Sequence, residues 1–528
     1  MLRFIPRTAL LCLAVAAGLT AVTTGARKAE AGGTLIWGTP AEMSVFDPHV
    51  ACGWLTYNAT SMIYDGLVDI DLTKPDAPYA ELKPALAKSW DISDDGLTYT
   101  FHLREGVKFH DGTEFNADVV KWNYDRFWNE KAPQFNKQAK AFLGYYTRWI
   151  DSVDVVDPLT VKVKLKEPNY EWLQTGVTSC GEPMIMSPAA VQKWGDEQIA
   201  LHPVGTGPFK FVEREQNVKV VLERNDGYWG DKAKLDKLIF RPLEDPATRL
   251  AALRAGEVNM ITETPWDEID GLVKDGFQLS IQKNAPSIWF LYFNLDNKVM
   301  QDIRVRKAIS MAIDKKGIAH EILKDMARPE DGLLSAGTFA YDPNFKGWPY
   351  DPEQAKKLLA EAGYANGLDL QFDIYQYGYN EVWEKWIQRD LKKVGINLQL
   401  NKYEWVTYMG IWIAGMKPEI AMNEIGWGWS IPYWTGIVSR CDYRPPNGFN
   451  SGHYCNPKVD ELLNKARATA NREEAAKLYQ EANKIMILDD VAFFTKFDYY
   501  NPILLAPNVK GFVNGQENWY DFTTVSVE

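Results

Sequence analysis

Apolar and polar residues alternate along two segments in the first third of the chain. Residues 97–103 place Leu, Tyr, Phe and Leu at every second position, and residues 161–165 place Val, Val and Leu there with lysines between them. A period of two is typical of a β-strand with one buried face. Both segments are therefore predicted to be strands at the edge of a core.

Helices are indicated by their ends as much as by their apolar faces. Asp351-Pro352-Glu353-Gln354 combines an N-cap residue, a proline at the first helical position and a glutamine at the third, and Gly363 follows the last apolar position. Similar starts occur at Asp245-Pro246, Asn456-Pro457 and Asn471. Each of these predicts a helix.

The predicted strands and helices are mixed along the whole chain, without an internal repeat or a low-complexity linker. Such mixing favours α/β lobes that interleave over domains arranged one after another. The chain has 528 residues, more than one hydrophobic core supports, so at least two lobes are expected.

The first residues have the pattern of a secretory signal peptide. Arg3 and Arg7 accompany the apolar run from Leu10 to Val22, and Ala29-Glu30-Ala31 offers small residues for cleavage before Gly32. Residues 1–31 are thus predicted to be removed. No later segment approaches the roughly 20 apolar residues of a transmembrane helix, so a soluble mature protein is expected.

The net charge and the absence of common catalytic motifs argue against several classes of function. A formal net charge of −12 argues against nucleic acid as a partner. The chain has no G-x-S-x-G elbow, P-loop or C-x-x-C motif, and His320-Glu321 lacks a second histidine at the i+4 position, where Lys324 stands. The histidines have no metal-ligand spacing. We therefore expect a protein that is not an enzyme and that carries no metal or cofactor.

Four cysteines remain after the predicted cleavage, and an even number favours disulfides in an oxidising compartment. Cys441 and Cys455 enclose a segment rich in Pro, Gly and Asn that can bring both sulfurs together, so this pair is expected to be bonded. Cys52 and Cys180 would then pair by elimination. Four separate buried thiols are the alternative.

The segment from Ala87 to Gly112, AKSWDISDDGLTYTFHLREGVKFHDG, resembles the signature of the extracellular solute-binding proteins of family 5, which include oligopeptide-, dipeptide- and nickel-binding proteins of ABC importers. Further similar segments, before and after this signature, occur in the family's order along essentially the whole predicted mature chain. They are Phe46-Asp47-Pro48, Gly205 to Phe209, Asn225 to Trp229, Arg249 to Gly256, Phe293 to Ala308, Tyr350 to Gly363 and Leu391 to Ile396.

The resemblance implies a two-lobed α/β periplasmic binding protein (type II, cluster C) with an extra subdomain inserted in lobe one. On that template, lobe one is 32–287 plus 501–528, with the insert at about 76–202, and lobe two is 288–500. The hinge is expected at Trp289 to Leu295 and Phe494 to Tyr500, since few residues need to absorb the rotation. Ordinary buried strands there are compatible with this role.

The family also implies the function. The protein is expected to capture peptides or peptide-like solutes between its lobes in the periplasm, as a monomer, and to deliver them to an ABC permease and its ATPase in the inner membrane. An oligosaccharide or opine-like sugar conjugate is the alternative solute. A secreted hydrolase and a receptor for a sensor are further alternatives.

One segment departs from the peptide-binding pattern. Peptide-binding members carry an aspartate for the ligand's ammonium group after a Gly-Trp pair, but residues 426–434, GWGWSIPYW, contain no acid. Aromatic rings and a serine stand there instead, with core packing as the alternative role of the rings. The candidate ligand-binding residues are Trp427, Trp429, Ser430, Tyr433 and Trp434, with Trp405 and Trp54 as further rings and Arg440 and Arg444 as carboxylate-binding candidates.

Overall fold

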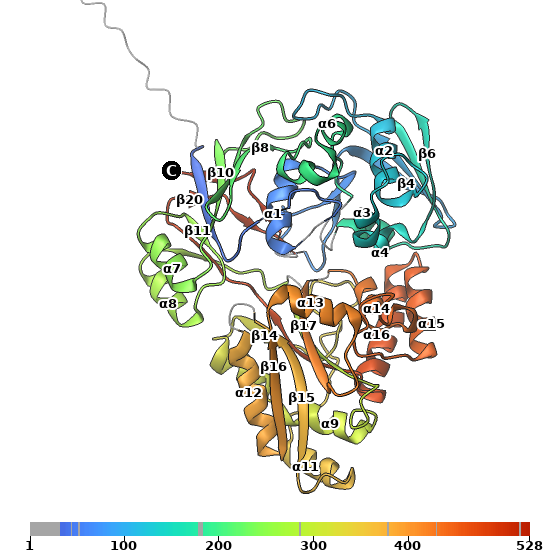
Figure 1. Ribbon diagram of the computed structural model, residues 1–528, viewed down its shortest axis with the longest axis vertical. Helices are drawn as coiled ribbons and strands as arrows, with labels where there is room; N and C mark the ends of the chain where they lie inside the picture. The colour runs from blue at the N-terminus through green and yellow to red at the C-terminus, as the bar shows by residue number, and fades with distance from the viewer. Residues whose placement is uncertain are drawn as a thin grey trace, which may run out of the picture.

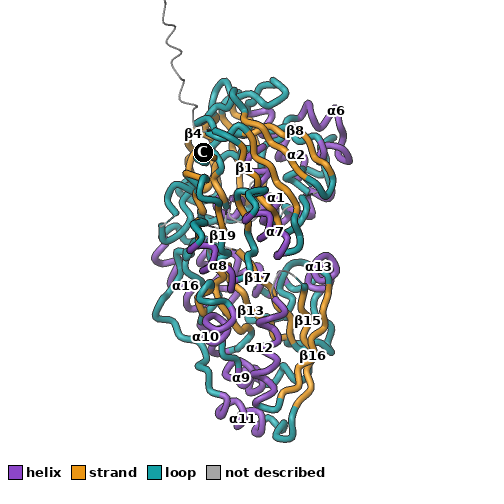
Figure 2. The backbone as a smooth tube through the Cα atoms, turned by 90° about the vertical axis from the view of Figure 1, so that its left-hand side faces the viewer, coloured by secondary structure: helices purple, strands orange, loops and turns teal. Residues whose placement is uncertain are grey.

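The computed structural model describes residues 32–43, 45–50, 53–75, 77–177, 183–284, 287–376, 380–428, 430–516 and 519–528. They form two lobes, an upper and a lower one in Figure 1, each built around its own mixed sheet. Figure 2 shows the same two lobes from the side, with the lower lobe narrowing toward α11 (Pro352–Glu361). The α/β class and the two-lobed architecture expected from the sequence are confirmed.

The upper lobe contains a seven-stranded sheet in the order β12-β19-β11-β1-β10-β9-β8. The first strand is parallel to β10 and β11, and the other pairs are antiparallel. Helices α1 (Trp54–Ile63), α7 (Pro246–Arg254) and α8 (Trp266–Lys274) belong to this lobe. The strands are β1 (Thr34–Thr39), β8 (Phe209–Glu215), β9 (Lys219–Arg224), β10 (Lys237–Pro242), β11 (Met260–Ile261), β12 (Gln278–Ser280) and β19 (Ile503–Leu505).

A separate four-stranded antiparallel sheet lies on the right of the upper lobe in Figure 1, in the order β4-β5-β7-β6. Both alternating segments of the sequence are strands of this sheet, and Tyr99 and Phe101 are fully buried beneath it. The strands of this sheet are β4 (Ala87–Ile92), β5 (Thr98–Leu103), β6 (Ile150–Asp157) and β7 (Thr160–Leu165). The same part of the chain forms the helices α2 (Ala117–Trp128), α3 (Lys137–Phe142), α4 (Gly144–Thr147), α5 (Trp172–Val177) and α6 (Pro188–Gln198).

The lower lobe contains a six-stranded sheet in the order β14-β18-β13-β17-β15-β16. Its strands are β13 (Ser287–Phe293), β14 (Ala327–Pro329), β15 (Leu368–Tyr375), β16 (Ile396–Tyr403), β17 (Met422–Gly428) and β18 (Phe493–Tyr499). Its helices are α9 (Ile303–Ala312), α10 (Lys315–Gly317), α11, α12 (Asn380–Lys393), α13 (Trp405–Ala414), α14 (Tyr433–Ser439), α15 (Pro457–Arg467) and α16 (Arg472–Lys484).

Three short strand pairs complete the set of strands in the described residues, and short 3-10 or π-helical turns lie at Ile199–Leu201, Ile318–Ile322, Cys441–Tyr443 and Ile485–Asp489. The strand pairs are β2 (Val68–Ile70) with β3 (Leu82–Pro84), β20 (Val509–Lys510) with β23 (Ser526–Val527), and β21 (Val513–Asn514) with β22 (Tyr520–Asp521). Over these residues no helix combines the length and the apolar composition needed to cross a membrane.

The helix starts expected from the sequence are confirmed at all four positions. Asp351 Oδ1 accepts a hydrogen bond from the Gln354 amide at 2.9 Å, and Asp245 Oδ1 accepts one from the Thr248 amide at 2.8 Å. The side chain of Asn471 likewise accepts hydrogen bonds from the first turn of α16, and that of Asn456 from the first turn of α15. Each cap satisfies an amide that has no partner within its own helix.

The chain passes between the two sheets after β12 and again after β18. The stretches expected at the hinge are largely strands β13 and β18, neighbours at the centre of the lower sheet. The second link between sheets is the short segment 500–502, where Asn501 has a positive φ of 47°. The two links between the sheets are therefore short, and each lies beside a paired strand.

Candidate functional site

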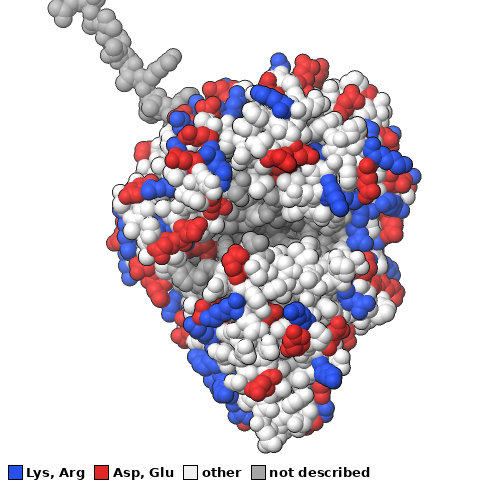
Figure 3. All heavy atoms as spheres, in the orientation of Figure 1, with Lys and Arg blue, Asp and Glu red and all other residues white. Residues whose placement is uncertain are grey.

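A hollow runs across the face of the molecule between the two lobes, as Figure 3 shows. Strand β16 ends at Tyr403, just before α13 at the border of the lobes in Figure 1. Strands β15 and β17 are parallel in the same sheet, so their carboxyl ends lie at this edge too. Ligands of open α/β sheets bind outside such carboxyl ends. The hollow is therefore the candidate ligand site.

Helix α13 forms part of the lower rim of this hollow, and we call Trp405–Ala414 the α13 lip (Figures 1 and 3). Its ten residues, WVTYMGIWIA, include no charged side chain. Trp405 is 40% exposed and Ile413 is 42% exposed. The indole of Trp405 lies 4.9 Å from the ring of Tyr375 at the end of β15. The lip thus presents apolar surface beside the hollow.

The segment without an acid begins at the end of β17 and continues into α14. Trp427 is half-buried, and its ring lies 5.5 Å from Trp412, 5.8 Å from Trp434 and 5.4 Å from Phe449. Trp434 is 1% exposed, and its ring lies 5.3 Å from Tyr145 in the upper lobe. The structure therefore packs these rings together across the boundary of the lobes.

The other residues of this segment lie in different surroundings. Ser430 is fully buried, and Trp429 lies outside the described residues. Tyr433 is also buried: its hydroxyl accepts a hydrogen bond from Trp149 Nε1 at 3.0 Å and lies 3.3 Å from the Tyr443 hydroxyl. Since Trp149 belongs to the upper lobe, Tyr433 is a contact between the lobes.

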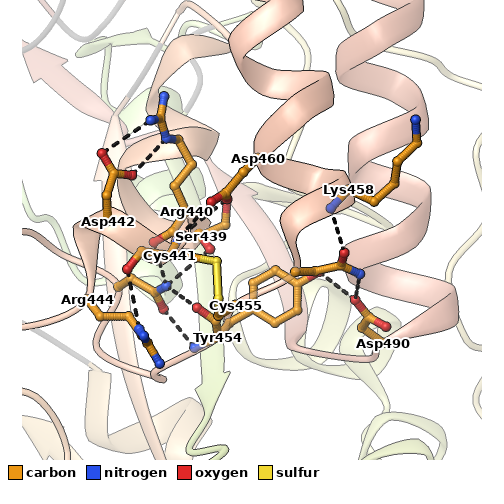
Figure 4. Close-up of a disulfide and its surroundings, with 12 residues drawn as sticks. Ser439, Arg440, Cys441, Asp442, Arg444, Tyr454, Cys455, Lys458, Asp460 and Asp490 are labelled. Atoms are coloured by element: carbon orange, nitrogen blue, oxygen red, sulfur yellow. Dashed lines mark hydrogen bonds and ion pairs between the residues drawn. A yellow bond between two sulfur atoms is a disulfide. The ribbon is translucent and has the colours of Figure 1, made fainter.

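Trp54 and the two arginine candidates lie apart from the α13 lip. Trp54 begins α1 and is half-buried, with its ring 5.8 Å from Trp37 and 6.0 Å from Tyr520 in the upper lobe. Arg440 Nε donates to Asp442 at 2.9 Å, and Arg444 Nε donates to the Cys441 carbonyl at 3.3 Å (Figure 4). Both guanidinium groups therefore already have acceptors on their own loop.

The same loop carries the disulfide between Cys441 and Cys455, whose Cα atoms lie 4.5 Å apart (Figure 4). The amide group of Asn450 donates to the carbonyls of Ser439, Arg440 and Tyr454 inside this loop. The loop is therefore tied at several points beside α14. Cys52 and Cys180 lie outside the described residues.

A buried ion cluster lies under the cleft edge of the lower sheet. Lys496 on β18, Glu384 on α12 and Glu424 on β17 are all fully buried. Lys496 Nζ donates to Glu384 at 2.8 Å and also to Glu424. Burial and the facing Glu424 carboxylate raise the pKa of Glu384 well above its usual range.

Sequence patterns missed the buried carboxyl group of Glu171. It comes just before α5 in the upper lobe, and its partners Tyr433 and Tyr479 belong to the lower lobe. Nothing in the local sequence marks these contacts, because the partners lie more than 250 residues away. Within the described ranges, no group of three or more His, Cys, Asp or Glu side chains is placed to bind a metal ion.

Known proteins resemble the chain over most of its length. The family described as bacterial extracellular solute-binding proteins, family 5 (middle region), matches residues 81–439. The glutathione-binding protein GsiB of Pectobacterium atrosepticum is 32% identical over 89% of this chain and 89% of its own. Heme-binding protein A of Haemophilus influenzae is 28% identical over 95% of this chain and 93% of its own.

A solved structure has the same fold. The ABC transporter-associated periplasmic binding protein DppA from Helicobacter pylori, in complex with the peptide STSA, superposes with a TM-score of 0.83 at 28% identity. The superposition covers 94% of this chain and 99% of DppA. The fold is thus shared over nearly the whole of both chains.

Proposed function

Because the chain belongs to the bacterial extracellular solute-binding proteins of family 5, we propose that it captures a peptide or peptide-like solute in the hollow between its lobes and presents it to an ABC permease and its ATPase. Closure on the solute, with no chemical change to it, is the mechanism. The family resemblance carried by the sequence signature is confirmed, and with it the role in an ABC importer.

The proposed lobes follow the two large sheets. Lobe one comprises residues 32–287 and 501–528, with the inserted subdomain at about 76–202, and lobe two comprises 288–500. The strand order supports this division, since β19 lies between β12 and β11 although it follows the whole lower sheet in sequence. Residues 1–31 act as a cleaved signal peptide that directs the monomeric protein to the periplasm, where family members such as DppA reside.

The α13 lip carries the proposal about the solute. Its exposed Trp405 and Ile413, and the absence of any charge along its ten residues, favour a solute whose apolar part lies on this helix. Segment 426–434 offers no carboxylate to a free ammonium group. Peptide-like solutes with a large apolar group, such as capped or conjugated peptides, are therefore favoured over short hydrophilic peptides.

A sugar conjugate or an oligosaccharide is the second candidate. The indole of Trp405 supports it, because an exposed indole face can stack on a sugar ring. The two candidates predict different roles for Ile413. A sugar would stack on the flat indole of Trp405 and gain little from contact with the aliphatic side chain of Ile413.

Mass spectrometry of small molecules that remain bound through purification, followed by thermal shift with peptides, glutathione, opines and oligosaccharides, tests the proposal. A solute that raises the melting temperature without being converted supports capture. Stabilisation by no compound, together with no bound molecule in the purified protein, contradicts it.

Trp405→Ala is expected to weaken binding of such a solute by about 1–3 kcal/mol, because the ring would lose its apolar contact. Isothermal titration measures this loss. Trp194→Ala is the matched control, since Trp194 is also a partly exposed indole but lies on α6, away from the hollow in Figure 1. Equal affinities of the wild type and Trp405→Ala for the solute would show that the α13 lip does not contact it.

A further inference from the structure

The inserted subdomain of the upper lobe packs against α14, α15 and α16 of the lower lobe. In Figure 1 these helices lie beneath α3 and α4. The Tyr170 amide donates to the Arg467 carbonyl at 2.9 Å, so the contact includes the backbone of both lobes. The Arg467 side chain donates to the Pro168 carbonyl at 2.9 Å and to Glu167 at 2.6 Å. This contact joins the two lobes, so the proposed opening would break it.

Glu171 lies inside this contact and is 5% exposed. One carboxyl oxygen, Oε2, accepts a hydrogen bond from the Tyr433 amide at 3.1 Å, and Oε1 accepts one from the Tyr479 hydroxyl. Both partners belong to the lower lobe. The upper lobe therefore supplies the carboxyl group, and the lower lobe supplies both hydrogen-bond donors.

The surroundings of this carboxyl group offer little compensation for a negative charge. Burial raises the pKa of Glu171 to about 7, against the lowering effects of its two hydrogen bonds and of more distant Arg472 and Arg467. Arg467 is held by Glu167 and lies 4.1 Å from the Trp149 ring, and the Arg472 guanidinium lies 4.8 Å from the Tyr79 ring. The titratable groups that face Glu171 are Tyr99 on β5, Tyr433 on α14, Arg467 on α15, and Arg472 and Tyr479 on α16.

We propose that Glu171 is a positioning residue that couples closure of the lobes to the uptake of one proton: its carboxyl group is neutral in the closed contact and ionises in water when the lobes separate. This goes beyond solute capture, although it rests on the proposed opening and closing of the lobes. Separation removes both donors and exposes the carboxyl group at the same time, so its two states differ in solvation as well as in hydrogen bonding.

The sign of the pH effect follows from the two states. In the open form the group is exposed and titrates near its ordinary pKa of 4.5, and in the closed form burial holds the pKa at about 7. Between these values closing binds a proton, so the ratio of closed to open molecules falls by up to about tenfold for each unit of rising pH. Above pH 7 and below pH 4.5 this dependence disappears, because both states then have the same protonation.

Small-angle X-ray scattering of the solute-free protein between pH 5 and pH 8 tests the coupling. The radius of gyration is expected to rise with pH in the wild type. In Glu171→Gln it is expected to stay at the compact value, because the amide oxygen can accept from the Tyr433 amide and its NH2 group can donate to the Tyr479 oxygen without a charge. Glu167→Gln is the matched control: Glu167 also contacts the lower lobe but is 60% exposed, and the pH dependence should persist in that variant.

Tyr479→Phe provides a second variant. Its hydroxyl group lowers the pKa of Glu171, so its removal is expected to extend the pH dependence of the radius of gyration to higher pH. An infrared difference spectrum between wild type and Glu171→Gln at pH 6 should show the band of one protonated carboxyl group. A radius of gyration that is independent of pH in the wild type, or a Glu171→Gln variant that follows the wild-type curve, overturns the inference. Solute binding is measured separately, so capture in the hollow is judged by its own experiment.

Discussion

At the residue scale, the glycines of the Gly205-Thr206-Gly207 segment allow two backbone segments to meet. The Gly207 amide donates to the Ile63 carbonyl at 2.9 Å, and its own carbonyl accepts from Asn225 Nδ2 at 3.0 Å. Thr206 donates to Asp65 at 2.7 Å. This segment therefore anchors the end of α1, and the close backbone approach explains the two glycines.

Gly207→Ala is expected to destabilise the protein by about 1–3 kcal/mol, because close packing leaves no room for a methyl group. A Cβ atom there would lie 2.6 Å from both the Met62 carbonyl oxygen and the Ile63 carbonyl carbon. Urea unfolding followed by circular dichroism measures the loss.

Gly271→Ala is the matched control for this prediction. A Cβ atom at Gly271 meets nothing within 4 Å, and the residue lies within α8. The free energy of unfolding should rise there by up to about 1 kcal/mol, since alanine favours helix over glycine. Similar losses in both variants would contradict the steric explanation.

At the element scale, the cluster of Lys496, Glu384 and Glu424 joins β18, α12 and β17 just below the hollow. One positive charge faces two carboxyl groups, and burial together with the neighbouring Glu424 raises the pKa of Glu384. The cluster therefore fixes the relative positions of three elements whose ends approach the ligand site. The cluster thus helps to position the edge of the candidate site, although none of its side chains is exposed to solvent.

Lys496→Met should destabilise the protein by about 3–5 kcal/mol at pH 7, because Glu424 is then left buried without a cation. Glu384→Gln should cost less, because an amide of the same shape can donate to Glu424 while its oxygen accepts from Lys496. Denaturant unfolding of both variants gives the comparison. A larger loss in Glu384→Gln than in Lys496→Met would contradict the central role of the Lys496 cation in the cluster.

Elements with local signals were predictable from the sequence. The capped starts of α7, α11, α15 and α16 and the alternating strands β5 and β7 depend on residues that are neighbours in the chain. The burial of Trp434 and Ser430 was not predictable, because a run of aromatic and small residues is equally compatible with a core and with a pocket. Strands β13 and β18 are paired although more than 200 residues separate them, and a local sequence pattern cannot predict such a pairing.

At the scale of the whole molecule, Arg467 connects the lobes through a side chain that is 6% exposed. Arg467→Met should shift the solute-free protein toward the open form by about 1–3 kcal/mol, because the Pro168 carbonyl then lacks a donor in the closed form but is hydrated in the open one. A larger radius of gyration in small-angle scattering is the expected result.

Arg148→Met is the control for this shift. Arg148 also joins the lobes, through an ion pair with Asp442 at 3.3 Å, but both side chains are more than one third exposed. Such a pair contributes at most about 1 kcal/mol. An equal or larger opening in Arg148→Met would mean that the contact does not depend on the buried guanidinium group.

The position of β19 also determines the order in which the chain can be assembled. This strand supplies the partner of β12 and one partner of β11, yet it begins at Ile503, after every residue of the lower sheet. The lower sheet has all of its strands once β18 has been synthesised, whereas the upper sheet also needs residues 503–505. The upper sheet is therefore the second of the two large sheets to receive all of its strands, although it contains the first strand of the chain.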